Sequence, residues 1–83
     1  MYDVLFTFHS LTAAQRGRAV CGHHGISGAV IRAPLGLSTK GCGYGLRVGG
    51  QMSERAALVM RLEGADFERA YRLAGGRTEE VAL

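Results

Sequence analysis

The amino-acid sequence predicts an α+β domain with a ferredoxin-like βαββαβ fold, in which two helices cover a four-stranded antiparallel sheet. Segments with an apolar residue at every second position alternate with segments whose apolar residues recur three or four positions apart, and these periods are typical of strands and helices respectively. The segments follow one another in the order β-α-β-β-α-β. With right-handed crossovers, this order produces one antiparallel sheet that carries both helices.

The first half of the chain supplies a strand, a helix and a second strand. Aromatic and β-branched residues alternate over residues 2–8, which predicts the first strand. Ser10 or Thr12 can cap a helix that runs to about His24. Residues 26–33 then form the second strand, which a proline ends because proline has no N–H to donate to a ladder.

The second half repeats this arrangement. Residues 35–41 form a loop, and residues 44–48 alternate as the third strand before two glycines break it. Ser53 is expected to cap a helix over residues 54–63, and residues 67–73 form the fourth strand.

Each helix is expected to place one face on the sheet, and Gly25 is the expected stop of the first helix. The residues predicted to face inward on the first helix are Leu11, Ala13, Ala14, Gly17, Val20, Cys21 and His24. Those on the second helix are Ala57, Leu58 and Leu62.

The length of 83 residues allows a single domain, which we assign to residues 1–74, with residues 75–83 as a frayed or briefly helical tail. The chain opens directly on a strand, and its apolar stretches are far shorter than the roughly 20 residues that cross a bilayer. We therefore expect a cytoplasmic protein without membrane contacts, with both cysteines as free thiols. A nucleic-acid partner is not expected, because the net charge is only +3 and the third strand offers a single aromatic residue, Tyr44.

The segment that indicates chemistry surrounds Cys42. This thiol lies between Gly41 and Gly43, and Lys40 before it and Arg47 after it favour the reactive thiolate. The alternative is a tight turn with a small filler residue, since free cysteines usually behave as small hydrophobes.

The predicted topology gives Cys42 a second kind of support. The connection between strands two and three lies at the same sheet edge as the first β-α turn, so Cys42 is expected near His9, Ser10 and Thr12. Free backbone N–H groups at a helix start stabilise an anion, whether thiolate, persulfide or selenide. His9 could also exchange a proton or donate a hydrogen bond.

Cys21 is expected to be a core residue instead. At about 1.5 Å per helical residue it lies about 15 Å from the Cys42 end, too far for a disulfide, which needs Cα atoms within about 7 Å. Cys21, His23 and His24 do not have the spacing of a zinc site. We expect no metal and no cofactor, and the histidines are expected in solvent near the helix C-terminus.

Nearly the whole chain resembles the small bacterial selenium/sulfur-carrier-like domains. The motifs that carry the resemblance are Thr7-Phe8, Ser10 to Ala14, Gly25-Ile26, Ala33-Pro34, Leu37-Ser38, Gly41-Cys42-Gly43-Tyr44 and Leu46-Arg47-Val48. The resemblance implies a ferredoxin-like fold and a cysteine that carries sulfur or selenium, matched here by Cys42, with Ser38 in the same block. Members often have Arg directly after the proline, where this chain has Leu35; Arg32 is the candidate to replace it.

Two functions follow from these observations. In the first, Cys42 accepts sulfur or selenium from a cysteine desulfurase-like donor, holds it as a persulfide or selenide, and passes it to an acceptor enzyme. Such a carrier is a co-substrate more than an enzyme. In the second, the chain is a binding or regulatory module that docks to a larger enzyme or forms a homodimer, and Cys42 is structural. A thiol sensor is a third, weaker option.

Overall fold

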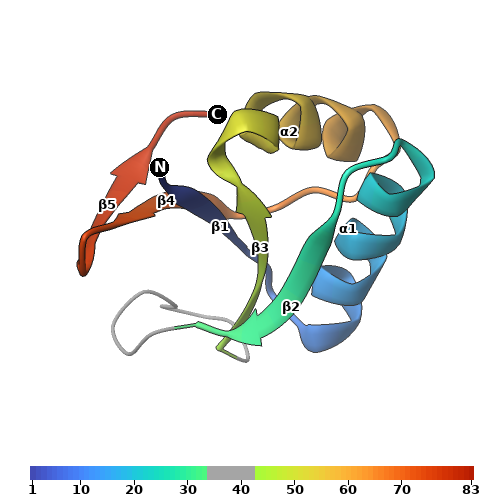
Figure 1. Cartoon of the computed structure of the whole chain (residues 1–83). Coiled ribbons are helices and arrows are strands. Elements are labelled where there is room, and N and C mark those ends of the chain that lie inside the picture. The colour runs from blue at the N-terminus through green and yellow to red at the C-terminus, as the bar shows by residue number, and fades with distance from the viewer. Residues whose placement is uncertain (34–42) are drawn as a thin grey trace.

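The computed structural model describes residues 1–33 and 43–83 of the chain. The described elements are β1 (Asp3–Thr7), α1 (Leu11–His23), β2 (Gly28–Arg32), β3 (Tyr44–Gly49), a 3₁₀ turn η1 (Gly50–Met52), α2 (Ser53–Leu62), β4 (Arg69–Ala74) and β5 (Arg77–Val81). The strands form one sheet in the order β2-β3-β1-β4-β5, and every pairing is antiparallel (Figure 1). The predicted α+β class with two helices on an antiparallel sheet is confirmed, and the ferredoxin-like assignment stays a prediction.

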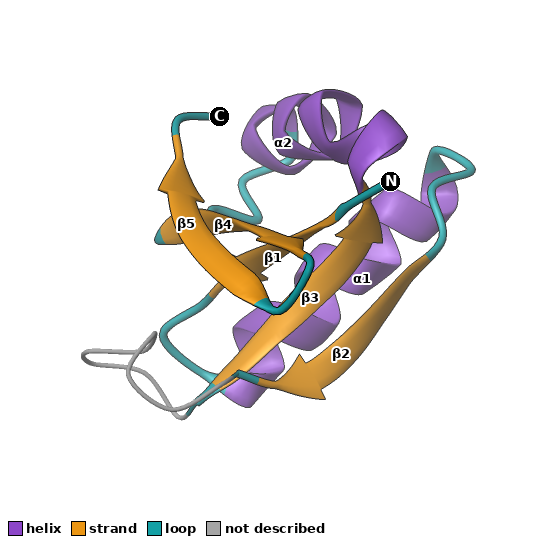
Figure 2. Cartoon of the chain, turned by 60° about the vertical axis from the view of Figure 1, so that its left-hand side comes forward, coloured by secondary structure: helices purple, strands orange, loops and turns teal. Residues whose placement is uncertain are grey.

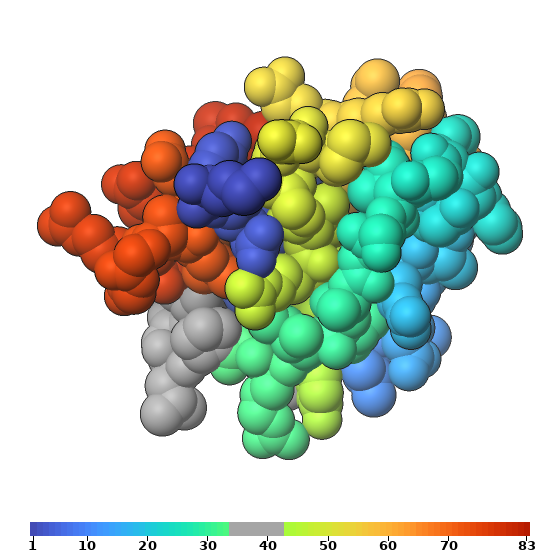
Figure 3. Space-filling view, in the orientation of Figure 1, coloured from blue at the N-terminus to red at the C-terminus, as the bar shows by residue number. Residues whose placement is uncertain are grey.

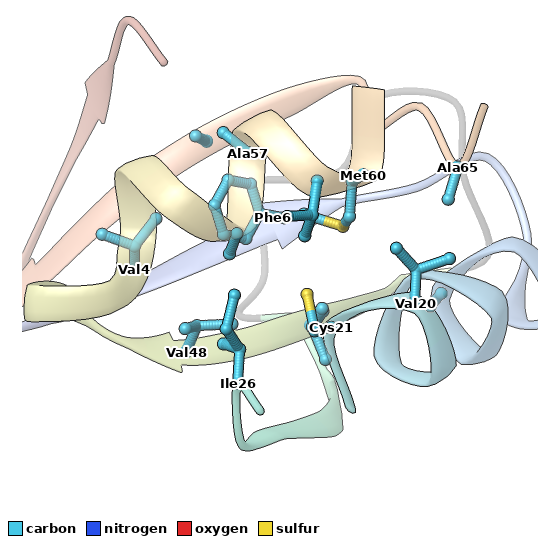
Figure 4. Close-up of a cluster of buried hydrophobic side chains, with 14 of the residues drawn as sticks. Val4, Phe6, Val20, Cys21, Ile26, Val48, Ala57, Met60 and Ala65 are labelled. Atoms are coloured by element: carbon cyan, nitrogen blue, oxygen red, sulfur yellow. The ribbon is translucent and has the colours of Figure 1, made fainter. Parts of the chain in front are cut away.

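Both helices pack on the same face of the sheet (Figure 2). β1 is the central strand, and its Val4 and Phe6 point toward the helices, as do their antiparallel neighbours Val48 and Leu46 on β3. These side chains meet buried residues of both helices in one hydrophobic cluster (Figure 4). Alternate residues of β1 therefore point to the helix-covered face of the sheet, where they join one core.

The prediction of four strands is wrong, because residues 77–81 form a fifth strand rather than part of a tail. Gly75 and Gly76 have φ angles of +55° and +75°, which suits a two-residue hairpin turn that reverses β4 into β5. β5 has mainly charged and exposed residues and lies at the sheet edge, where such residues are usual. The pair of glycines after a strand was the signal for this hairpin.

The predicted ends of α1 are confirmed. The Ala13 N–H donates to Ser10 Oγ at 3.0 Å, so Ser10 is the N-cap. At the other end Gly25 has φ +75°, and the Ile26 N–H donates to the carbonyl of Cys21 at 2.9 Å. This left-handed glycine closes the helix as expected. Within the described residues, no helix has both the length and the apolar character that a membrane crossing requires.

The predicted start and inward face of α2 are partly wrong. Ser53 is the first helical residue, and its hydroxyl donates to the carbonyl of Gly50 at 2.8 Å instead of capping. Leu58 and Leu62, predicted to face inward, are 56% and 74% exposed. The helix follows a 3₁₀ turn, and its inward residues are Ser53, Ala56, Ala57, Val59 and Met60. On α1, Leu11 and His24 are likewise exposed rather than inward.

Candidate functional site

Four strand ends and the start of α1 lie together at one end of the sheet. Thr7, the last residue of β1, pairs with Gly45 of β3 and with Arg69 of β4. Arg32, the last residue of β2, pairs with Tyr44. α1 begins at this end (Figure 1), which we call the site end.

The backbone on both sides of residues 34–42 is held at the site end. The Ala33 N–H donates to the carbonyl of Gly43 at 2.5 Å. Gly43 has φ +82°, a left-handed conformation that favours glycine. The β2–β3 connection therefore begins and ends beside the β1–α1 turn, as the topology predicted. Ser38, Lys40, Gly41 and Cys42 lie outside the described residues, so their predicted roles stay predictions.

The start of α1 offers positive electrostatic potential at the site end. The Ser10 hydroxyl accepts from Ala13, and the first turn of the helix has no acidic residue. The remaining N–H groups of the first turn are not used within α1 and point their dipoles outward. His9 is exposed directly before the cap. Three of the predicted supporting residues, His9, Ser10 and Gly43, belong to the described part of the chain and lie at this end.

A groove of about 460 Å³ runs beside this helix start. It lies between the first turns of α1 and the segment that leads into β4, and its lining is His9, Ser10, Thr12, Ala13, Arg16, Gly64, Ala65, Asp66, Phe67 and Glu68. The second wall of the groove was not predicted from the sequence. It comes from residues more than 50 positions away from His9, and no local pattern in the chain signals such a contact.

The guanidinium of Arg32 contacts the side chain of Tyr44, the residue after Gly43. Arg32 Nη2 donates to the hydroxyl of Tyr44 at 3.2 Å, and the guanidinium carbon lies 5.4 Å from the centre of the ring. Both residues are at the ends of their strands, so the guanidinium is at the site end. Arg32 therefore places a positive charge at the site end, and its replacement of the arginine that members often have after the proline stays a prediction.

Arg47, which was predicted to favour the Cys42 thiolate, has a different partner. Its Nε donates to Asp3 Oδ2 at 2.7 Å, and its Nη2 lies 2.6 Å from the same oxygen. Asp3 is the first residue of β1, and the site end begins at its last residue. The guanidinium of Arg47 thus neutralises a carboxylate toward the opposite end of the strand.

Cys21 is a core residue, as predicted. It is fully buried and a free thiol, and its side chain points into the hydrophobic cluster (Figure 4). Burial raises the pKa of this thiol, because the thiolate would lose its hydration. Nearby, His24 Nε2 lies 2.5 Å from Glu63 Oε2. In the part of the chain that the structure describes, no group of three or more His, Cys, Asp or Glu side chains is arranged to hold a metal ion.

The chain is a small α+β domain in which the start of α1 and the guanidinium of Arg32 lie at the same end as Ala33 and Gly43, the residues that flank the β2–β3 connection. Residues 3–72 match the model of the family described as "Putative Se/S carrier protein-like". The chain belongs to this family, as its motifs indicated. The match runs from β1 into β4, and β5 lies outside it. No curated protein and no solved structure matches the chain.

Proposed function

We propose that this protein is a sulfur or selenium carrier in which the thiolate of Cys42 holds the cargo. The observation that supports this most directly is that the backbone flanking residues 34–42 is tied to the sheet beside the start of α1. Membership of the carrier-like family supports the class of cargo.

Covalent geometry supports the proximity of Cys42 to this end. Cys42 is bonded to Gly43, and successive Cα atoms are about 3.8 Å apart. Gly43 in turn is hydrogen-bonded to Ala33. The free N–H groups of α1 and the guanidinium of Arg32 are the described groups that can lower the pKa of a nearby thiol and stabilise a persulfide anion.

The proposed transfer is a thiolate–persulfide exchange without net oxidation. The Cys42 thiolate attacks the outer sulfur of a donor's persulfide, forming a new S–S bond at Cys42 while the donor's S–S bond breaks and the donor thiolate leaves. An acceptor nucleophile then attacks the same outer sulfur, and Cys42 returns to the thiolate. An outer selenium atom would follow the same exchange. We propose a cysteine desulfurase-like donor, a separate acceptor enzyme and a reducing, cytoplasmic setting that keeps both thiols free.

Intact-mass spectrometry tests this proposal. The reduced protein is incubated with a cysteine desulfurase and cysteine, and the expected product carries one added sulfur atom at Cys42. The matched control is Cys21→Ala, which should load as the unaltered protein does, while Cys42→Ala should not load. An unmodified protein, or equal labelling of Cys42→Ala, would contradict the carrier function.

A further inference from the structure

The outer face of α2 exposes two large apolar side chains one turn apart. Leu58 is 56% and Leu62 is 74% exposed, because the helix turns Ala57 and Met60 toward the core instead. Leucines four positions apart lie on the same side of a helix. They therefore form one continuous apolar ridge rather than two separate exposed side chains.

A groove of about 420 Å³ lies alongside this ridge. Its lining is Glu54, Ala57, Leu58, Arg61, Ala82 and Leu83. The groove exists because β5 returns the chain to α2, where Val81 and Leu83 pack against the hydrophobic cluster. We call Glu54, Leu58, Arg61, Leu62 and this groove the α2 surface. It contains both a ridge and a depression, which is what self-association of one patch requires.

The charges on the α2 surface are self-complementary in one direction only. Glu54 and Arg61 are seven positions apart, about 10 Å along one side of the helix. Neither side chain has an ion pair with any residue in the described ranges, although the Arg61 guanidinium lies 4.7 Å from the ring centre of Phe67. Two antiparallel copies of α2 would place Glu54 opposite Arg61 twice, whereas parallel copies would oppose like charges.

We propose that the α2 surface binds a second copy of this chain, with the two α2 helices antiparallel about a two-fold axis. Leu58 of each copy enters the groove of the other copy between two Glu54–Arg61 pairs, and Leu62 extends the apolar contact just beyond these pairs. The β2 side of the site end stays open, because α2 lies along one margin of the molecule and β2 finishes at the opposite margin (Figure 3). This inference goes beyond the proposed carrier function and does not depend on it.

The expected dimer is weak, because two leucines per copy bury little area compared with a standard interface. Its formation should therefore depend on protein concentration. Sedimentation velocity from micromolar to millimolar concentration, with a reductant and in the Cys42→Ser background to exclude linked thiols, should show a monomer–dimer equilibrium.

Charge reversal makes the test specific. Leu58→Lys should raise the dissociation constant at least about tenfold, since it places a charge in the centre of the contact. Glu54→Arg and Arg61→Glu should each weaken the dimer, and the double variant should restore it because the pairs are then re-formed with exchanged signs. The control is Leu11→Lys, at a 37% exposed leucine on α1, which should leave the equilibrium unchanged.

Circular dichroism shows that each variant is folded before its dissociation constant is compared. A monomer at every concentration would overturn the proposal, as would a dimer that Leu58→Lys leaves intact. A double charge reversal no better than the single ones would overturn the antiparallel pairing.

Discussion

The two ends of α1 lie in very different environments. Cys21 in its last turns is enclosed by the hydrophobic cluster, where burial raises the pKa of its thiol. Ser10, about 16 Å away along the axis, opens the site end, where the described groups are backbone N–H donors, the exposed imidazole of His9 and the guanidinium of Arg32. The comparison shows that the last turns of this helix favour a neutral thiol, whereas its start presents groups that can stabilise an anion.

The largest expected effect is a loss of stability when the hydrophobic cluster that encloses Cys21 is disrupted. Phe6 is fully buried in the central strand, with its ring 4.7 Å from that of Phe67 in an edge-on contact. Phe6→Ala should lower the free energy of unfolding by about 3–5 kcal/mol, because it removes apolar contacts and leaves a cavity. Urea unfolding measures this change. Leu62→Ala is the control and should change stability little, and a comparable loss in both variants would contradict the assigned core.

Two glycines of α1 allow the buried and the exposed side of the helix to be compared through smaller changes in stability. A Cβ atom at Gly17 would lie 2.7 Å from Phe8 Cζ and 3.1 Å from Met60 Sδ, while one at Gly22 would meet nothing within 4 Å. Gly17→Ala should therefore destabilise the protein by about 1–3 kcal/mol through overpacking. Gly22→Ala should stabilise it by about 0.5–1 kcal/mol through its helix propensity. Thermal unfolding of the two variants gives the sign, and equal signs would show that Gly17 does not face the core.

Substitution of the N-cap residue tests how α1 begins at the site end. Ser10→Ala removes the acceptor for the Ala13 N–H and should cost about 1 kcal/mol of stability. Ser10→Asp keeps an acceptor at this position and should retain most of that stability. Chemical denaturation of the three proteins measures the stability that the cap contributes. An unchanged midpoint in Ser10→Ala would show that Ser10 does not stabilise the start of α1.

The smallest expected effect is a pH dependence from Cys21. Its pKa in the folded state is raised above the ordinary value of 9.0 by burial, so the folded protein keeps the neutral thiol. The stability from this group is complete below pH 9 and is lost as pH rises through the folded pKa. The stability difference between the unaltered protein and Cys21→Ala should therefore shrink in alkaline buffer. A difference that stays constant above pH 9 would argue against a buried neutral thiol.

Features encoded by neighbouring residues could be predicted from the sequence, and those that depend on distant contacts could not. The cap at Ser10, the stop at Gly25 and the burial of Cys21 each follow from residues within one or two helical turns. The pairing of Arg47 with Asp3 joins positions 44 residues apart, so no local pattern could indicate that Arg47 has a partner other than the Cys42 thiolate.

The exposed ridge of α2 was missed for a different reason. Apolar residues lie on both sides of this helix, so the residue pattern alone does not distinguish a core face with Ala56 and Met60 from one with Leu58 and Leu62. The charged composition of β5 likewise concealed a strand whose sole local signal was Gly75-Gly76. At the candidate site, the start of α1 and the flanks of the β2–β3 connection followed from topology alone, whereas the groove wall at residues 64–68 arises only from tertiary packing.

The most direct test of the central claim is the pH dependence of alkylation of the two thiols in the folded protein, measured site by site by mass spectrometry. We predict that Cys42 reacts without unfolding and titrates well below the ordinary thiol pKa of 9.0, while Cys21 reacts only when denaturant unfolds the chain. A Cys42 that titrates at the ordinary value, or that is as protected as Cys21, would contradict it.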